Sequence, residues 1–521
     1  MPSADQSFAQ SALIAALQQA EHYPHPVAGV EHRQTHISHI LLAGDYAYKI
    51  KKPVNLGFVD FTSLARRHYY CEQELRLNRR LAPALYLDCV PIGGSPSQPR
   101  LGATPAIEYA VRMRRFAQSA LLDQALAAGQ LESQHIDGLA RQLADFQRII
   151  PVADPQTPFG DPEQVIQPMR DNFVQTRPRL SDPADWAVLA EVERWTLAAF
   201  EQLQPRLAER KAGGWIREGH GDLHLGNMIL TDTGQVSIFD CIEFNEALRW
   251  IDIVNDLAFL TMDLQARGAG GLAQRLLNVW LEYSGDFAGM ALLTYYQVYR
   301  AMVRAKVYAI QASAVKENAA ASCRAYLHLA LALTELPTPF LLITHGVSGS
   351  GKSRRTGQLL EVLPGAIRIR ADVERKRLFG LDPLEDSRSS LGQGLYTAEA
   401  SARTYQRLLT LAEHLLRMGR PVLVDATFLQ RAHRQPFREL AAQLGVPFIL
   451  LECSAADPVV LRERVAARRV RGDDPAEADA TVLERQLRYV EAPTAEEHPL
   501  KTAGDEHVLE LQRAILASRR A

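Results

Sequence analysis

Two groups of residues in the sequence have the types and the spacing needed for phosphoryl transfer. The first lies in His220–Asn227 and is completed by Asp240, which follows an apolar strand-like run after a short predicted hairpin. Transfer of a phosphoryl group to a hydroxyl requires that the acceptor is positioned and that the charge of the triphosphate is neutralised. Asp222 could accept the proton of the acceptor hydroxyl or orient it, whereas the oxygens of Asn227 and Asp240 are hard ligands that suit Mg²⁺. A single aspartate of this kind would instead be an ordinary turn or capping residue.

The second group is a complete G-x-x-x-x-G-K-[ST] motif: Gly346, Val347, Ser348, Gly349, Ser350, Gly351, Lys352 and Ser353. It follows the strand-like run 340–344 and precedes a helical pattern over 354–362, which is the context that a phosphate-binding loop requires. The glycines let backbone N–H groups close around phosphates. Lys352 would reach the outer phosphates and Ser353 would bind Mg²⁺. A flexible structural loop is the alternative interpretation.

Two aspartates in the same part of the chain follow strand-like runs. Asp425 ends the run 421–424 and suits a role at the Mg²⁺ site, although it could also be a turn residue at a strand end. Asp372 follows residues 367–370 and precedes three basic side chains. A carboxylate in this position could activate a hydroxyl acceptor; the rival interpretation is a helix N-cap.

Three arginines recur at the spacing of one helix face: Arg464, Arg468 and Arg471. They could belong to a mobile lid that carries positive charge to the transferring phosphate, with Arg468 as a candidate catalytic residue. A solvated basic face explains the same spacing.

The elements that must position these residues change character near residue 337. Hairpin-like strands over 35–42 and 46–51, a helix over 61–81 and mainly helical patterns up to 333 indicate a bilobal α+β part. Two closely spaced prolines then end the helical stretch 311–333. Strand-like runs at 340–344, 366–369, 422–424 and 448–451 alternate with helical patterns, which predicts an α/β part with a parallel sheet covered by helices. We therefore expect domains at 1–336 and 337–521.

Composition and charge narrow the class of protein. The 521 residues are 47% hydrophobic and 23% charged, with a formal net charge of -2, which is ordinary globular usage. The five cysteines are scattered, as expected in a reducing compartment. The N-terminus is not typical of a signal peptide, and the most apolar stretch, 291–308, is interrupted by basic residues. We expect a cytoplasmic protein without a membrane partner.

The segment His220–Asn227 with Asp240 resembles the aminoglycoside phosphotransferase family, whose fold is that of bilobal protein kinases. The resemblance covers approximately residues 30–330. It implies catalytic Asp222, Mg²⁺ ligands Asn227 and Asp240, an ATP-phosphate lysine at Lys49 with Glu74 as its carboxylate partner (Glu72 is less favoured), and a structural aspartate at Asp256. Lys51 and Lys52 lie near Lys49, so a solvated basic strand is the alternative interpretation of this lysine. This sequence departs from the family in two places: Cys241-Ile242-Glu243 follows the metal aspartate, and residues 41–45 contain only one glycine.

The C-terminal part resembles small P-loop kinases of the gluconate and shikimate kinase, polynucleotide kinase and zeta-toxin types. Asp372 with its basic neighbours, and Asp425-Ala426-Thr427, are most similar to the polynucleotide kinase and zeta-toxin branch, which uses the matching aspartate on the acceptor hydroxyl. The whole arrangement resembles bacterial fusions of an aminoglycoside phosphotransferase-like domain with a P-loop ATP-binding domain.

These observations predict a bifunctional kinase that uses ATP and Mg²⁺ to phosphorylate a hydroxyl of a small polar metabolite of the sugar or nucleoside type. Two alternatives remain open. One half could be a nucleotide-sensing regulatory module for the other, or the P-loop half could be a nucleic-acid 5′-hydroxyl kinase. The net charge does not support nucleic-acid binding but leaves it open for the P-loop half. The sequence leaves the oligomeric state undetermined.

Overall fold

The computed structural model describes residues 4–57, 59–313, 318–387, 397–453, 457–472, 474–502 and 508–518. Its chain divides into two compact units. Unit 1 comprises Met1–Leu139, Phe146–Asp171 and Phe200–Leu260. Unit 2 comprises Ala140–Asp145, Asn172–Ala199 and Thr261–Ala521. Each unit contains one of the two predicted sites, and each is described by itself.

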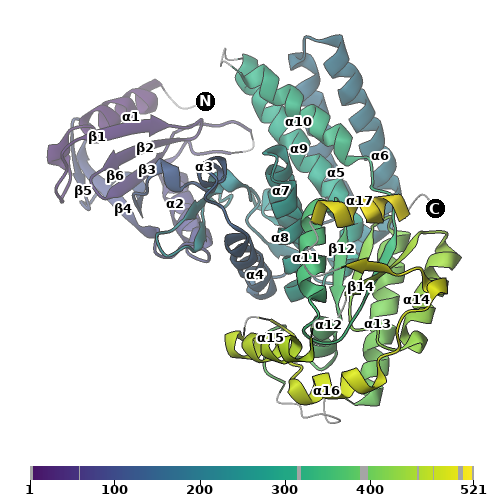
Figure 1. Cartoon of the computed structure of the whole chain (residues 1–521). Helices are drawn as coiled ribbons and strands as arrows, with labels where there is room; N and C mark the ends of the chain where they lie inside the picture. The colour runs from purple at the N-terminus through teal and green to yellow at the C-terminus, as the bar shows by residue number, and fades with distance from the viewer. Residues whose placement is uncertain are drawn as a thin grey trace. The chain divides into compact units, whose positions relative to one another are not determined.

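A six-stranded antiparallel sheet in the order β1-β2-β3-β6-β4-β5 forms the β-rich part of unit 1 (Figure 1). Its strands are β1 (Val30–Gln34), β2 (Ser38–Ala43), β3 (Tyr46–Lys51), β4 (Tyr86–Ser95), β5 (Gln98–Leu101) and β6 (Ala106–Arg114). The hairpin predicted around Gly44 is confirmed, because Ala43 pairs with Tyr46 at the start of the β2–β3 ladder.

Helices α1 (Ala4–Ala16) and α2 (Leu64–Asn78) contribute to the hydrophobic clusters on the two faces of this sheet. Alternation along β3 sorts its side chains between those faces. Tyr48 and Ile50 belong to the cluster that includes α1, and Ala47 belongs to the cluster that includes α2. Lys49 and Lys51 share the face of Ala47, so both lysines point towards α2.

Short elements carry the predicted catalytic loop in unit 1. The predicted hairpin is present as β8 (Met228–Leu230) and β9 (Val236–Ile238), which pair antiparallel. A second antiparallel pair joins β7 (Ile216–Glu218) to β10 (Trp250–Asp252), and α7 (Ile253–Ala266) follows. The other helices before α7 are α3 (Leu122–Ala127), α4 (Ser133–Ile149), α5 (Pro162–Thr176) and α6 (Pro183–Ala212).

Unit 2 contains the predicted parallel sheet, in the order β12-β13-β11-β14-β15. Its strands are β11 (Leu341–His345), β12 (Ile367–Arg370), β13 (Val422–Asp425), β14 (Phe448–Cys453) and β15 (Leu500–Thr502). Its helices are α11 (Lys352–Val362), α12 (Ala371–Leu378), α13 (Ala398–Arg417), α14 (Arg431–Leu444), α15 (Pro458–Arg471), α16 (Ala480–Tyr489) and α17 (Val508–Ser518). Four of the strands were predicted; β15, which is short, was not. In Figure 1 the labelled strands β12 and β14 lie among α11, α13 and α14.

Helices before residue 337 also belong to unit 2: α8 (Gly270–Ser284), α9 (Met290–Ser313) and α10 (Ala319–Leu333). The predicted helical stretch 311–333 is therefore the end of α9 and the whole of α10, with residues 314–317 outside the described part. Among the described residues, no helix combines the length and apolar character needed to cross a membrane. Unit 2 thus includes helices that the sequence placed in the first domain, and a domain boundary at 337 stays a prediction.

Candidate functional site

The predicted phosphate lysine of unit 1 lies between two carboxylates. Lys49 Nζ is 2.7 Å from Glu74 Oε1 and 2.7 Å from Asp240 Oδ1. Burial alone would lower the pKa of Lys49, but the charges of Asp240 and Glu74 outweigh it and hold this pKa well above its usual value. Glu72, the less favoured alternative partner of Lys49, is instead more than half exposed, and its carboxylate lies 3.6 Å from His68.

The catalytic loop is held together by hydrogen bonds between its own residues and α7. Asn227 Nδ2 donates to the backbone oxygen of Asp222 at 3.0 Å and to its carboxylate at 3.1 Å, which leaves the Asn227 amide oxygen as a possible metal ligand. The Asp256 carboxylate accepts from the backbone N–H groups of His220 at 2.7 Å and Gly221 at 3.0 Å. Asp256 therefore fixes the entry into this loop, in keeping with the structural role implied by the family resemblance.

Asp240 adopts an unusual backbone conformation. Its φ of 65° is in the left-handed region, which non-glycine residues rarely occupy, although aspartate tolerates it better than most. The backbone N–H of Asp240 donates to the Tyr86 hydroxyl at 3.3 Å, and the next N–H, of Cys241, donates to Asn78 Oδ1 at 2.8 Å. These two bonds support the turn that aims the Asp240 carboxylate at Lys49.

Sequence reasoning missed a second buried lysine at this site. Lys51 Nζ is 2.7 Å from Glu74 Oε2 and also contacts Glu243. All three side chains are almost completely buried. Burial would raise the pKa of Glu74, but Lys49 and Lys51 lower it to about 2. The segment after Asp240, where the sequence departs from the family, thus contributes Glu243 to this buried cluster. In the sequence its partner Lys51 could be recognised only as part of a basic strand.

The phosphate loop of unit 2 connects β11 to the N-terminus of α11. Gly349 and Gly351 adopt φ values of 82° and 95°, which side chains other than glycine disfavour. A Cβ at Gly351 would meet no atom within 4 Å, so the backbone lines open space there. Lys352 Nζ donates to the Val347 carbonyl at 2.8 Å. Burial lowers the pKa of Lys352, although the Asp425 charge opposes this effect.

Asp425 lies at the carboxyl end of β13, beside the helix that carries the phosphate loop. Its Oδ2 accepts a hydrogen bond from Thr356 Oγ1 of α11 at 3.2 Å. Arg370 Nε lies 3.9 Å from the same oxygen. The carboxylate therefore lies beside α11, the helix whose second residue is Ser353, the other predicted Mg²⁺ ligand of this unit.

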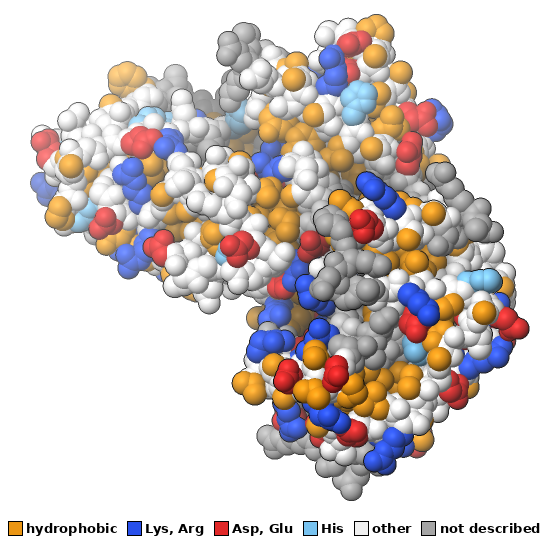
Figure 2. Space-filling view, in the orientation of Figure 1, with side chains coloured by type: hydrophobic (Ala, Val, Ile, Leu, Met, Phe, Trp, Pro, Cys, Tyr) orange, Lys and Arg blue, Asp and Glu red, His pale blue; other side chains and the backbone are white. Residues whose placement is uncertain are grey.

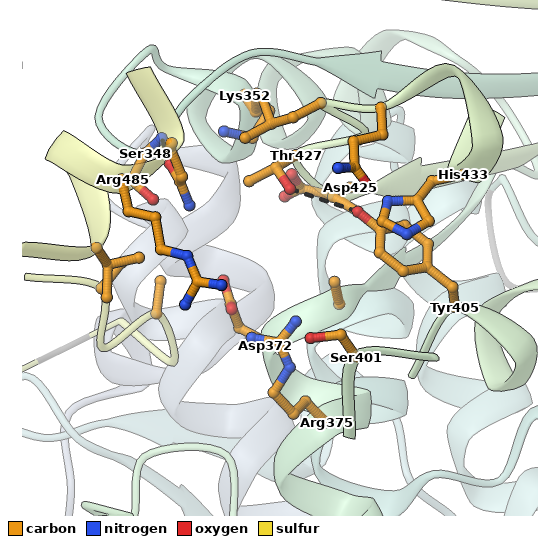
Figure 3. A pocket seen from close by; sticks show the side chains of 18 of the residues that line it. Ser348, Lys352, Asp372, Arg375, Ser401, Tyr405, Asp425, Thr427, His433 and Arg485 are labelled. Carbon is orange, nitrogen blue, oxygen red and sulfur yellow. Dashed lines mark hydrogen bonds between the residues drawn. The ribbon is translucent and has the colours of Figure 1, made fainter. Parts of the chain in front are cut away.

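Asp372 lines a cavity with the phosphate loop, as Figure 3 shows. It is the second residue of α12, whose N-cap is Arg370, and no side chain caps this helix. The rival interpretation of Asp372 as an N-cap is therefore wrong. Arg375 lies one turn further along α12, and the Arg485 side chain points towards Asp372 from α16 (Figure 3). The cavity brings a carboxylate and two guanidinium groups together.

A neutral aromatic surface forms another wall of the same cavity. The rings of Tyr405 and His433 stack with centroids 4.1 Å apart and an interplanar angle of 18°. Burial raises the pKa of Tyr405 and lowers the pKa of His433, so both rings are uncharged near neutral pH. The Tyr405 hydroxyl lies 3.4 Å from Thr427 Oγ1, the polar residue that follows β13 (Figure 3).

The predicted arginine face lines a second cavity, around the phosphate loop. Arg464, Arg468 and Arg471 of α15 line it together with residues 349–355. In the lower part of Figure 2, Lys and Arg side chains lie among acidic and hydrophobic ones. Three residues line both this cavity and the Asp372 cavity: Lys352, Ser353 and Arg468. The two cavities are therefore adjacent at the end of the phosphate loop.

Both units contain donor sets that fit Mg-ATP. In unit 2 the buried Ser350 hydroxyl has no hydrogen-bond partner, and no carboxylate lies within ion-pairing distance of Lys352, among the residues that the structure describes. An unpaired buried cation beside open backbone N–H groups suits a phosphate. In unit 1 the oxygens of Asn227 and Asp240 suit Mg²⁺.

Comparison with known families and proteins agrees with this division. Residues 58–293 match the Phosphotransferase enzyme family, and residues 341–493 match an AAA domain family. The chain is 31% identical over 483 residues to Uncharacterized protein Mb2027c of Mycobacterium bovis, covering 92% of this chain and 94% of that protein. Uncharacterized protein Rv2004c of Mycobacterium tuberculosis matches at the same identity and coverage.

Among solved structures, a choline/ethanolamine kinase family protein from Mesorhizobium loti is 15% identical, covers 62% of this chain and 95% of its own, and has a TM-score of 0.38. The Mycobacterium tuberculosis APS kinase CysC is 20% identical, covers 36% of this chain and 99% of its own, and has a TM-score of 0.27.

The two family matches confirm the predicted sequence resemblances of both parts and the prediction that the protein is an enzyme of the kinase class. The matched segments contain every predicted site residue except Lys49, which precedes residue 58. The chain therefore belongs to the same family as these mycobacterial proteins and is a kinase that joins a phosphotransferase-family segment to a P-loop segment of the AAA type.

Proposed function

We propose that the P-loop part transfers the γ-phosphoryl group of ATP to a hydroxyl of a small polar metabolite of the sugar or nucleoside type, in the cytoplasm. The phosphotransferase-family part also binds Mg-ATP in this proposal. One observation carries it: the cavity that contains Asp372 meets the phosphate-loop cavity at Lys352, Ser353 and Arg468. An acceptor beside Asp372 would thus face the terminal phosphate.

The residues of unit 2 have distinct roles in this reaction. Asp372 would accept the proton of the acceptor hydroxyl as it attacks the γ-phosphorus, because its carboxylate lines the acceptor cavity without serving as a helix cap. Lys352 and Arg468 would hold the charge of the transferring group. Ser353 and Asp425 would hold Mg²⁺, which neutralises charge on the phosphate oxygens.

The aromatic wall supports an acceptor with a flat or ring-shaped neutral part. Tyr405 and His433 present stacked, uncharged rings to the cavity. Such rings pack against the face of a sugar or a base. This feature favours the sugar or nucleoside class, and it is compatible with a nucleoside at the end of a nucleic acid, the alternative substrate for this site.

The test uses the full-length chain with labelled ATP against a panel of sugars, nucleosides and 5′-hydroxyl oligonucleotides. For an acceptor that is turned over, Asp372→Asn should slow transfer by about two to four orders of magnitude if Asp372 is a general base. Basal ATP hydrolysis would survive, because water can still reach the phosphate. Asp382→Asn is the matched control, since Asp382 is exposed in the same unit and lines neither cavity. Equal transfer by the wild type and Asp372→Asn would refute the proposed base.

A second candidate function for unit 1 is nucleotide sensing rather than transfer. The contact of Lys49 with both Glu74 and Asp240 favours it, because the phosphate lysine is already neutralised. Asp222→Asn distinguishes the two. Slower transfer at saturating substrates would show that unit 1 is itself an enzyme, and unchanged transfer would favour the sensing function.

A further inference from the structure

Helix α8 lies within the phosphotransferase-family match, yet its polar side chains bind the edge strand of the P-loop sheet. Strand β12 is at the edge of that sheet, so one row of its backbone groups lacks a neighbouring strand. Asn278 of α8 accepts a hydrogen bond from the Arg368 N–H at 2.7 Å and donates to the Ala366 carbonyl at 3.1 Å. Gln274 donates to the same carbonyl at 3.0 Å. The helix therefore satisfies backbone groups at the beginning of β12.

One turn further along α8, a buried carboxylate binds two arginines of β12. Glu282 Oε1 is 2.6 Å from Arg368 Nη2, and Glu282 Oε2 is 3.3 Å from Arg370 Nη1. All three side chains are at least nine-tenths buried. Burial would raise the pKa of Glu282, but the two guanidinium groups outweigh it and lower this pKa, so the carboxylate is charged at neutral pH.

Both arginines also lie beside residues that would hold Mg-ATP. Arg368 Nη1 donates to the Ser353 carbonyl at 3.2 Å, at the end of the phosphate loop. Arg370 lies 3.9 Å from Asp425 and 3.0 Å from Asp474, which follows α15. Glu282 is thus linked through Arg368 to Ser353 and through Arg370 to Asp425, the two predicted Mg²⁺ ligands.

We propose that Glu282 is a positioning residue of the P-loop site, which holds the charge of Arg370 back from Asp425 so that this carboxylate stays available for Mg²⁺. The inference rests on the proposed ATP binding at that site. In this inference α8, a helix of the phosphotransferase-family segment, contributes a residue that supports Mg²⁺ binding at the P-loop site.

The charges on either side of Arg370 explain why Glu282 has this effect. Among the described residues, Arg370 pairs with three carboxylates within 4 Å, of which Glu282 and Asp474 are nearer than Asp425. The charge of Asp372 acts on Arg370 as well, but more weakly than these three. If Glu282 lost its charge, the pull of Asp425 on Arg370 would be opposed by one carboxylate instead of two. A guanidinium that moved from 3.9 Å into contact with Asp425 would compete with a divalent cation for the same oxygens.

The experiment measures binding of a non-hydrolysable ATP analogue to the full-length chain over a range of Mg²⁺ concentrations. The parent chain carries Asp240→Asn, which weakens the site of unit 1, and Lys352→Ala in this parent identifies the signal of the P-loop site. Glu282→Gln in the parent should raise the Mg²⁺ concentration needed for half-maximal binding about tenfold. Adding Arg370→Gln to Glu282→Gln should recover most of this loss, because the competing cation is removed.

Arg275→Gln is the matched control on the same helix. Arg275 pairs with Glu361 of α11, but both side chains are about one-third exposed, so the change should be less than about twofold. A variant that merely damaged the packing of α8 would lower the melting temperature, and the second substitution would not restore Mg²⁺ affinity. The double variant also removes both charges together, which preserves the test if Glu282→Gln alone folds poorly.

Two outcomes would refute the inference about Glu282, and a third would refute the proposed function of the site on which it rests. A Glu282→Gln variant with the Mg²⁺ dependence of Arg275→Gln would refute it, and so would a double variant no better than the single one. If the parent shows no binding that depends on Lys352, the proposed function of the site fails and this inference fails with it.

Discussion

The two lysines that are predicted to bind phosphate differ in the charges that surround them. Lys49 of unit 1 is paired with Glu74 and Asp240, and these charges raise its pKa. Lys352 of unit 2 is equally buried, but its ammonium group donates to the Val347 carbonyl and its pKa is lowered. In unit 1 the lysine is already paired with carboxylates of the protein, whereas in unit 2 the lysine is available to an anionic ligand.

This difference teaches what each site needs in order to bind a nucleotide. At Lys352 an incoming phosphate adds a counter-charge to a buried cation that forms no ion pair among the described residues, so binding gains favourable electrostatic energy directly. At Lys49 the phosphate must share the cation with two carboxylates, and Mg²⁺ on Asp240 would release part of that pairing. We therefore expect the P-loop site to depend chiefly on its lysine and the site of unit 1 to depend more strongly on the metal.

The largest expected effect on nucleotide binding comes from removing Lys352, the lysine that forms no ion pair among the described residues. Lys352→Ala should weaken Mg-ATP binding at the P-loop site about 100-fold, since it deletes a charge-assisted hydrogen bond donor from a buried site. Binding at the site of unit 1 should not change. Calorimetry with Mg-ATP should show two sites in the wild type and one in the variant. A wild type with only one site would break the comparison itself.

Removing the charge of Glu74, the carboxylate shared by Lys49 and Lys51, tests how much this ion-pair network contributes to the free energy of unfolding. Glu74→Gln should lower the free energy of unfolding by about 3 kcal/mol at neutral pH, because it leaves Lys49 and Lys51 buried with one partner fewer. The folded-state pKa of Glu74, about 2, is below its ordinary value of 4.5. Its stabilising contribution is therefore present above pH 4.5 and lost as the pH falls towards 2.

Urea unfolding from pH 7 down to pH 3 measures this dependence. The difference between the wild type and Glu74→Gln should shrink as the pH falls below the ordinary carboxylate range. Glu72→Gln is the control, because this neighbour on α2 is mostly exposed and should change stability by less than about 0.5 kcal/mol. A constant difference at all pH values would show that Glu74 acts through packing rather than charge.

Withdrawing the metal sharpens the comparison between the sites. With a chelator present, ATP binding to the Lys352→Ala variant, which reports unit 1, should weaken about 30-fold. Binding to an Asp240→Asn chain, which chiefly reports the P-loop site, should weaken less, because Lys352 still receives the phosphate. Fluorescence titration with a labelled ATP analogue measures both. The reverse order of metal dependence would contradict the roles assigned to the two lysines.

The smallest expected effect concerns the arginine that lines both cavities of unit 2. Arg468→Ala should slow phosphoryl transfer about tenfold, with little change in acceptor affinity, because one charged hydrogen bond to the transferring group is lost. Arg469→Ala is the control, since the adjacent side chain lines neither cavity. Initial rates with varied acceptor concentration separate the two effects. Equal rates for both variants would favour the alternative interpretation, in which Arg468 belongs only to a solvated basic helix face.

Much of both sites could be predicted because the residues that carry their chemistry are contiguous in the sequence. The phosphate loop needs glycines, a lysine and a hydroxyl at fixed spacing between a strand and a helix, so residues 346–353 identify it locally. The segment 220–227 likewise sets Asp222 and Asn227 five residues apart, and the structure joins them by hydrogen bonds. Apolar runs between prolines, glycines and helical patterns were enough to predict four of the five parallel strands.

Tertiary structure alone decided which distant charges share a site. The sequence placed Lys49 and Lys51 on one basic strand, but only the packing of β3 against α2 brings Glu74 to both and Glu243 to one. It left Asp372 open between a base and a helix cap, and only the structure places the N-cap at Arg370. It also gave no sign that Glu282 would meet Arg368 and Arg370. Local spacing determines what a residue can do, whereas the low dielectric of a shared interior determines which charges must be paired, and that depends on long-range contacts.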